Sequence, residues 1–161
     1  MTKSGACAAV AAAVLTGCAG TREGARAAAP AAGIVEALAV KQPGALDWKP
    51  KEVLPKGAFG ALLHGRLEEG PFDFFGKFPA GYTVPLHWHT NEVTVVMMRG
   101  SMVIGRPSQR DVEVEEGGFF VLPAKMQYMA HCERECMFLV HGERAFDILY
   151  ANAADDPRGR K

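Results

Sequence analysis

HWHTNEV, residues 87–93, places two histidines on either side of a tryptophan. Successive side chains of a β-strand point to opposite faces, so we expect His87 and His89 to share one face and Trp88 to take the other. Neighbouring imidazoles supply half of a typical metal site. The pair therefore predicts a divalent metal site on one face of a sheet, with the remaining ligands to be found elsewhere in the chain.

From Ile34 onward the chain can supply that sheet, because it consists of short runs rich in β-branched and aromatic residues, separated by Gly, Pro and charged turns. No stretch after residue 50 has a period of 3.6 over three turns. Closely spaced strands of this kind predict an all-β sandwich or barrel. The segment 34–40 (IVEALAV) fits either an amphipathic helical turn or an N-terminal strand. The expected strands are Ala58–Leu63, Phe72–Phe78, Thr83–His89, Val93–Arg99, Met102–Arg106, Val112–Glu115, Phe119–Leu122, Gln127–His131, Met137–His141 and Phe146–Ala151.

Chain length and net charge limit the classes of partner that we expect for this protein. A chain of 161 residues is long enough for one domain with a core of its own. Its 18 basic residues balance 18 acidic ones, so the formal net charge is zero. A neutral chain lacks the basic face that nucleic acid or an anionic lipid surface requires. We therefore expect a small-molecule ligand and no nucleic-acid partner.

The N-terminus has the layout of a targeting segment. Lys3 precedes an apolar stretch at residues 6–15 (ACAAVAAAVL), which ends in LTGC at residues 15–18. LTGC resembles the lipobox of bacterial lipoproteins; the alternative is a chance match in an alanine-rich N-terminus. The resemblance implies that Cys18 is lipidated and becomes the new N-terminus.

This resemblance implies a division of the chain and a location. Residues 1–17 would be a signal peptide, and the alanine-rich residues 18–33 a tether with little apolar surface to bury. The alternative for the tether is a short helix before Pro30, marginal in water at that length. The protein would then lie on the periplasmic side of the bacterial cell envelope and contact the membrane only through the lipid on Cys18.

Two cysteines remain after Cys7 and Cys18 are assigned to the N-terminal segment. They are Cys132 and Cys136 in HCEREC, where the three intervening residues suit a hairpin loop. Outside the cytoplasm such a pair can form a disulfide across the base of the loop. The alternatives are two free thiols, or weak metal-binding residues together with His131.

Two sequence motifs point to a known family: Gly81, His87, Trp88, His89 and Gly100 form the first, and Gly117 and Pro123 begin the second. Through these motifs, residues 48–157 resemble the small single-domain bacterial cupins. The resemblance implies a double-stranded β-helix, or jelly-roll barrel, wide enough inside for a metal and a small ligand. It also implies a homodimer. We assign residues 34–157 to this domain and 158–161 to a tail.

The resemblance also implies a ligand set, and the sequence departs from it. Cupins commonly bind a metal through both histidines, a glutamate four residues later, and a histidine five residues after the proline. Here those last two positions hold Val93 and Tyr128, and Glu92 stands one residue early. Glu92 faces outward unless a bulge shifts the register. Tyr128 either coordinates as a phenolate or fills the barrel mouth and donates a hydrogen bond.

Other residues are candidates for the pocket and for replacement ligands. Val93, Val95 and Met97 share the parity of His89, so we expect them to line the pocket with Tyr128. His141, in FLVHG, is a further pocket residue that could add a ligand. The methionines between residues 97 and 137 would suit copper, or would fill an irregular core. The metal could be Fe, Mn, Zn, Ni or Cu.

These observations predict an envelope-anchored cupin barrel with a degenerate metal site formed by His87, His89 and Glu92. One hypothesis is a metal-dependent enzyme, oxygenase-like or hydrolytic, acting on a small molecule. A second is a non-catalytic module that binds a small molecule in an apolar pocket. A third is a scaffold that forms dimers. No catalytic residue is assigned, because the sequence has no nucleophile motif, phosphate loop or dinucleotide fingerprint.

Overall fold

The computed structural model describes residues 39–159. The predicted signal peptide, the tether with Cys18, and most of the segment 34–40 lie outside the described residues. The described residues from Val40 onward belong to one compact unit. Across residues 39–159, no helix is long and apolar enough to cross a membrane.

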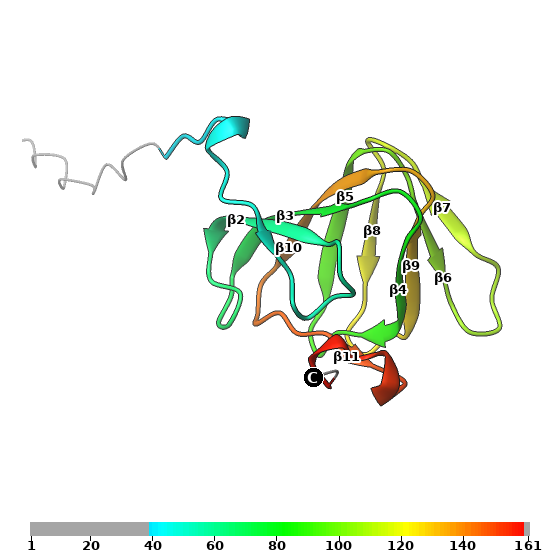
Figure 1. Ribbon diagram of the computed structural model, residues 1–161. Helices are drawn as coiled ribbons and strands as arrows, with labels where there is room; N and C mark the ends of the chain where they lie inside the picture. The colour runs from blue at the N-terminus through cyan, green and yellow to red at the C-terminus, as the bar shows by residue number, and fades with distance from the viewer. Residues whose placement is uncertain (1–38, 160–161) are drawn as a thin grey trace, which may run out of the picture. The chain divides into compact units, whose positions relative to one another are not determined.

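The unit is built from two antiparallel sheets that face each other and form a barrel (Figure 1). One sheet has the strand order β1-β2-β3-β10-β5-β8 and the other has the order β11-β4-β9-β6-β7. The prediction of an all-β jelly roll is confirmed. The strands are β1 (Lys49–Pro50), β2 (Phe59–Gly65), β3 (Phe72–Phe78), β4 (Tyr82–Trp88), β5 (Val93–Arg99), β6 (Met102–Gly105), β7 (Val112–Val114), β8 (Phe119–Leu122), β9 (Tyr128–Cys132), β10 (Cys136–Gly142) and β11 (Leu149–Tyr150).

Three short 3-10 turns complete the described part of the chain: η1 (Pro43–Ala45), η2 (Ala153–Asp155) and η3 (Pro157–Gly159). Strand β11 and the two C-terminal turns lie at the lower end of the barrel in Figure 1. β11 pairs with the last residues of β4, since Tyr150 stands opposite His87. The histidine pair therefore lies at this end of the barrel.

Alternating burial along the central strands defines the core. In β3 and in β10 every second residue is buried, so one face of each strand points into the barrel. Phe72, Phe74 and Phe78 of β3 lie on that face and pack beside Phe138 of β10 and Phe146. Burying an aromatic side chain of this size stabilises the fold by about 2–3 kcal/mol. The interior is therefore apolar and rich in aromatic rings.

The hairpin between β9 and β10 carries a disulfide. Cys132 and Cys136 are bonded, with their Cα atoms 6.2 Å apart, and both side chains are fully buried. Of the alternatives that the sequence left open, the disulfide is the one that the structure contains. His131 instead takes part in a hydrogen bond between its Nδ1 and Oγ1 of Thr83.

Candidate ligand pocket around a buried histidine pair

A register shift in β4 turns the histidines into the barrel. Tyr82 and Val84 are buried, so the inward residues at the start of the strand have even numbers. The pairing of β4 with β9 shifts between Val84 and His87, and from there the inward residues have odd numbers. Pro85 lies in this bulge, where a residue without an N–H leaves no ladder hydrogen bond unmade. His87 and His89 consequently share the inward face, as predicted, at 2% and 5% exposure.

Each imidazole is held through Nδ1 by a main-chain carbonyl. Nδ1 of His87 donates to the oxygen of Pro85 at 2.7 Å, and Nδ1 of His89 donates to the oxygen of Asp147 at 2.5 Å. A carbonyl oxygen can only accept, so in both neutral rings the proton sits on Nδ1 and Nε2 carries the lone pair. The bulge that turns His87 inward thus also supplies, through Pro85, the carbonyl that orients its ring.

Burial keeps both imidazoles neutral. It lowers the pKa of His87 to about 4, and the nearby His89 adds to that effect. Burial also lowers the pKa of His89, although the main-chain hydrogen bond to Asp147 opposes the shift. At neutral pH the pair therefore presents two uncharged rings, which lie nearly perpendicular with their centroids 5.4 Å apart.

Tyr128 of β9 completes the polar group. Its hydroxyl lies 2.7 Å from Nε2 of His89, and because that nitrogen is unprotonated, Tyr128 donates. The ring of Tyr128 also packs on His87 at a centroid distance of 4.2 Å. Burial raises the pKa of the Tyr128 hydroxyl well above its ordinary value, which favours the neutral phenol. Of the two predicted roles for Tyr128, the geometry fits the hydrogen-bond donor.

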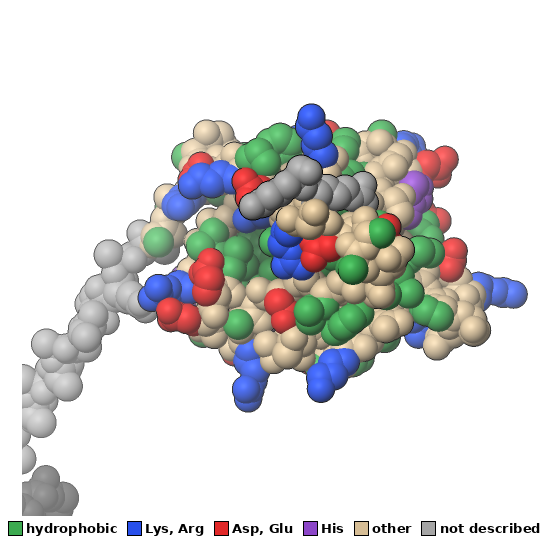
Figure 2. All heavy atoms as spheres, turned by 60° about the horizontal axis from the view of Figure 1, so that its bottom comes forward, with side chains coloured by type: hydrophobic (Ala, Val, Ile, Leu, Met, Phe, Trp, Pro, Cys, Tyr) green, Lys and Arg blue, Asp and Glu red, His purple; other side chains and the backbone are tan. Residues whose placement is uncertain are grey.

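The three side chains border a cavity of about 340 Å³. Its other buried wall residues are apolar, and phenylalanines from β3 and β10 are prominent among them. Its charged wall residues are exposed or half-buried, which places them toward solvent at the mouth. Figure 2 looks onto this end of the molecule, where hydrophobic side chains gather in a hollow among acidic and basic ones. The charged residues of the wall are Lys51, Glu52, Glu68, Asp147 and Arg158.

The segment from Phe146 to Ile148 forms one side of the pocket and fixes His89. The ring of Phe146 packs on His89 at a centroid distance of 5.0 Å. The carboxylate of Asp147 accepts hydrogen bonds from the main-chain N–H and the hydroxyl of Thr90. Asp147 therefore ties its own segment to the turn after β4 by its side chain, and orients His89 by its main chain.

The segment at residues 51–55 forms another side of the pocket. Val53 and Leu54 belong to the cavity wall, and two tyrosine hydroxyls tie this segment to the barrel. Tyr150 donates to the main-chain oxygen of Val53 at 2.9 Å, and Tyr82 donates to that of Pro55. The wall thus combines strands of the barrel with a segment that precedes it.

The predicted pocket residues divide into two groups. Val93 and Val95 line the cavity, as their parity predicts, and Tyr128 lines it as well. Met97 is buried at 1% exposure but packs in the core away from the cavity wall, so its assignment to the pocket is wrong. His141 is also wrongly assigned, because it occupies an outward position of β10 between Asp73 (2.8 Å) and Glu143 (3.1 Å). The hydrogen bond to Asp73, and then that to Glu143, raises the pKa of His141.

Glu92 does not join the histidines. Its side chain is exposed while Val93 beside it is buried, so β5 keeps the register that points Glu92 outward. The bulge near the site lies before the histidines rather than after them. Glu92 as a metal ligand is therefore corrected. Among the described residues, no three His, Cys, Asp or Glu side chains come together in a way that could hold a metal ion.

The donor set consequently fits a resident metal poorly. The two Nε2 atoms are correctly oriented, since metal-binding histidines usually donate their other ring N–H to a carbonyl or carboxylate. Nε2 of His89 is engaged with Tyr128, however, and the neutral phenol is a weak ligand. Catalytic zinc sites, for comparison, use at least three protein ligands.

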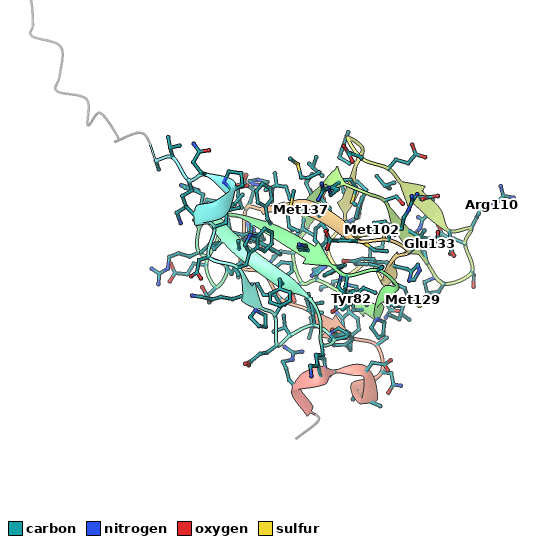
Figure 3. The ribbon with its side chains drawn as sticks, turned by 45° about the horizontal axis from the view of Figure 1, so that its top comes forward. Tyr82, Met102, Arg110, Met129, Glu133 and Met137 are labelled. Carbon is teal, nitrogen blue, oxygen red and sulfur yellow. A yellow bond between two sulfur atoms is a disulfide. The ribbon has the colours of Figure 1, made fainter. Side chains whose placement is uncertain are left out.

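The methionines are core and surface residues. Met102 lines the cavity and is 3% exposed, whereas Met98 and Met129 are 43% and 45% exposed. Figure 3 shows Met102 within the body of the barrel and Arg110 at the tip of the loop between β6 and β7. Among the described residues of the cavity wall, Met102 is the one methionine, so the structure favours the core-filling interpretation over a copper site.

Several wall residues were missed by the sequence analysis. Phe74 and Phe78 could have been found, because the alternation of residues 72–78 places them on one face of a strand. Phe146 and Asp147 gave no such signal, since their contacts with His89 span more than 50 residues. Arg158, assigned above to a tail, lines the cavity and donates to the oxygen of Ile148.

Comparison with solved structures identifies the fold. The chain is similar to the polyketide cyclase RemF of Streptomyces resistomycificus, with a TM-score of 0.64 and 18% identity over 74% of this chain and 89% of that one. It is also similar to a putative acetylacetone dioxygenase of Methylibium petroleiphilum (TM-score 0.58, 17% identity, 74% and 85% covered). An RmlC-like cupin of Shewanella frigidimarina matches with a TM-score of 0.55 and 13% identity, covering 65% and 89%.

At these identities the likeness concerns the fold. The chain is a small protein with the cupin fold, as the sequence predicted. No protein-family model and no curated protein matches the chain.

Proposed function

We propose that this small cupin barrel binds a mainly apolar small molecule in the cavity beside His87, His89 and Tyr128. The observation that carries the proposal is the combination of an apolar cavity of about 340 Å³ with one buried polar group on its wall. Ligand sites typically have this composition, in which apolar walls provide affinity and a few placed polar groups provide orientation. The volume lies at the lower end of the usual range for such sites.

A thermal-shift screen of the full chain in chelator, against a panel of small apolar metabolites, tests the proposal. Binding compounds raise the melting temperature of the native protein. Ala130→Leu adds bulk to the buried cavity wall, and should abolish those shifts. Met129→Leu changes the neighbouring, exposed side chain and should leave them intact. The proposal would be contradicted if no compound of the panel raised the melting temperature of the native protein. It would also be contradicted if the shifts persisted in Ala130→Leu.

A second candidate is a metal-dependent enzyme, oxygenase-like or hydrolytic, and one observation supports it. Both Nδ1 atoms donate to carbonyls, which is the orientation of metal-binding histidines. A divalent metal held by His87 and His89 would polarise a substrate oxygen or activate a bound molecule. Two proteins of similar fold are named as a polyketide cyclase and a putative acetylacetone dioxygenase, which adds support for an enzymatic role.

Elemental analysis distinguishes the two candidates. Protein purified after supplementation with Fe, Mn, Zn, Ni or Cu would carry one equivalent of metal if this candidate is right. The double substitution His87→Ala/His89→Ala would then remove the metal. Native protein that carries no metal under any supplementation speaks against the enzyme and leaves the binding proposal standing.

Lipid anchoring and the homodimer remain proposals. The LTGC sequence supports attachment to the envelope through Cys18, which palmitate labelling of the native chain and of Cys18→Ser would test.

A cross-strand row of apolar residues on the outside of the first sheet supports a dimer; it runs from Phe75 through Leu139 and Val96 to Phe119. Phe119 is 67% exposed, so Phe119→Glu should yield a monomer in light scattering if this face is the interface.

A further inference from the structure

We infer that the pocket selects ligands that bring a hydrogen-bond donor, such as the hydroxyl of a phenol or an enol, over ligands with a carboxylate. The inference rests on the proposed binding function and names the ligand class for that same site. It follows from counting the donors and acceptors that the cavity wall offers. Among the described wall residues that are buried, only His87, His89 and Tyr128 have nitrogen or oxygen in their side chains.

The histidines offer the cavity no proton. Each Nδ1 proton is committed to a main-chain oxygen, that of Pro85 for His87 and that of Asp147 for His89. A neutral imidazole has one donor and one acceptor, so the remaining nitrogen of each ring is an acceptor. Nε2 of His89 already accepts from Tyr128. Among the described residues, the His87 side chain hydrogen-bonds through Nδ1 alone, to Pro85, so its Nε2 is free to accept.

Tyr128 offers the cavity no proton either. A phenol has a single O–H, and that of Tyr128 is donated to His89 at 2.7 Å. Its oxygen keeps lone pairs that can accept. The buried wall therefore presents acceptors alone, with Nε2 of His87 as the free one and the oxygen of Tyr128 as the next.

A ligand hydroxyl matches this wall and a carboxylate opposes it. A phenolic or enolic O–H can donate to Nε2 of His87 while its ring or chain contacts the apolar wall. A carboxylate has acceptors only, so it would place a buried charge against lone pairs, and the buried side chains of the wall offer it no free donor. The exposed mouth does not compensate, because its two basic residues are outnumbered by three acidic ones. These are Lys51 and Arg158, against Glu52, Glu68 and Asp147.

The size of the cavity sets the size of the ligand. An apolar cavity of about 150 Å³ in another protein holds one benzene. The cavity here has about 340 Å³, a little more than twice that volume, so it has room for a fused two-ring compound. Naphthalene, 2-naphthol and 2-naphthoate share one ring system and differ only in the polar group, which makes them matched probes.

Equilibrium dialysis of the full chain against each probe, at neutral pH in chelator, tests the inference. We expect 2-naphthol to bind about ten-fold more tightly than naphthalene, the gain of one net hydrogen bond. We expect 2-naphthoate to bind at least about ten-fold more weakly than naphthalene. Naphthoate that binds as tightly as naphthol overturns the inference.

Other outcomes separate the inference from the function it rests on. Naphthalene and naphthol that bind equally well overturn the donor preference and leave small-molecule binding intact. No binding of any probe overturns both the preference for donors and the binding of apolar compounds of this size.

A variant locates the acceptor. In His87→Leu the ratio of naphthol to naphthalene affinity should fall to about one, because the free acceptor is gone. His64→Leu removes an exposed histidine of β2 and should keep the native ratio. A native ratio in His87→Leu overturns the inference.

Nitrogen-15 NMR of the native imidazoles provides a readout that does not depend on folding of the variant. Naphthol should shift the Nε2 resonance of His87 well beyond the shift caused by naphthalene. Equal shifts with the two probes overturn the inference.

Discussion

Tyr128→Phe tests the hydrogen bond on which the polar wall depends. The substitution removes one oxygen and leaves an aromatic ring of nearly the same shape in a site that is 5% exposed. Nε2 of His89 loses its donor, while Nδ1 stays bound to Asp147. Leaving a buried acceptor without a partner costs about 1–3 kcal/mol. Since the cavity beside His89 can admit a water to replace the phenol, we expect the lower part of that range.

The assay is urea denaturation of the full chain at neutral pH in chelator, with thermal unfolding as a second measurement. For a unit of this size, the expected loss corresponds to a fall of about 3–10 °C in melting temperature. The dependence of the free energy of unfolding on urea concentration should have the same slope in both proteins, because both expose the same surface on unfolding.

A double-mutant cycle with His89→Leu isolates the pair. If Tyr128 donates to His89, the two substitutions together cost less than the sum of the single ones, by about 1 kcal/mol. Full additivity, or a Tyr128→Phe protein as stable as the native one, would refute the assignment of donor and acceptor. The inference that the wall offers only acceptors would then lose its basis at Tyr128.

Further predictions concern pH and the disulfide. The pKa of His87 is about 4 in the folded protein and near 6.5 in the unfolded chain. Between pH 4 and pH 6.5, His87 therefore takes up a proton when the protein unfolds. Stability should therefore fall by about 3 kcal/mol as pH drops from 6.5 to 4, and His87→Leu should flatten this dependence in urea titrations at several pH values. Cys132→Ala/Cys136→Ala should lower the free energy of unfolding by about 2 kcal/mol, from the short loop that the bond closes. A reducing agent should then lower the melting temperature of the native protein and leave that of the variant unchanged.

Much of the fold was predictable because local alternation determines it. The expected bounds of β3, β5 and β8 are those observed, and each of these strands begins and ends at a change in composition. Strand bounds that depend on pairing with a distant strand were predicted less well. Of the expected strand Phe146–Ala151, only Leu149–Tyr150 pairs, and the preceding residues instead turn Phe146 toward His89. The two-residue strand β1 has no pattern of its own and was not predicted.

The site was predictable in its histidines and less so in its surroundings. Strand periodicity correctly gave the shared face of His87 and His89 and the outward position of Glu92. It did not give the bulge, although Pro85 within a strand is the signal that marks one. Contacts with Asp147 arise from tertiary packing, which one sequence does not reveal.

The same register explains why a complete ligand set is absent, and this can be tested by rebuilding one. Val93 is an inward residue of β5 that lines the same cavity as the histidines, and Tyr128 already contacts both rings. The double substitution Val93→Glu/Tyr128→His would place a carboxylate and a third imidazole at those inward positions, which gives the four donors that first-row divalent metals accept.

We expect the rebuilt site to change both metal retention and stability. Without metal the variant should be less stable than the native protein, because it buries an unpaired carboxylate. With added zinc its melting temperature should rise with metal concentration, and one equivalent should survive dialysis. Glu92→Ala serves as the control and should not affect retention, because its side chain points outward. A rebuilt site that retains no zinc would mean that positions 93 and 128 do not converge on the histidines, which would remove the geometric basis for the pocket described above.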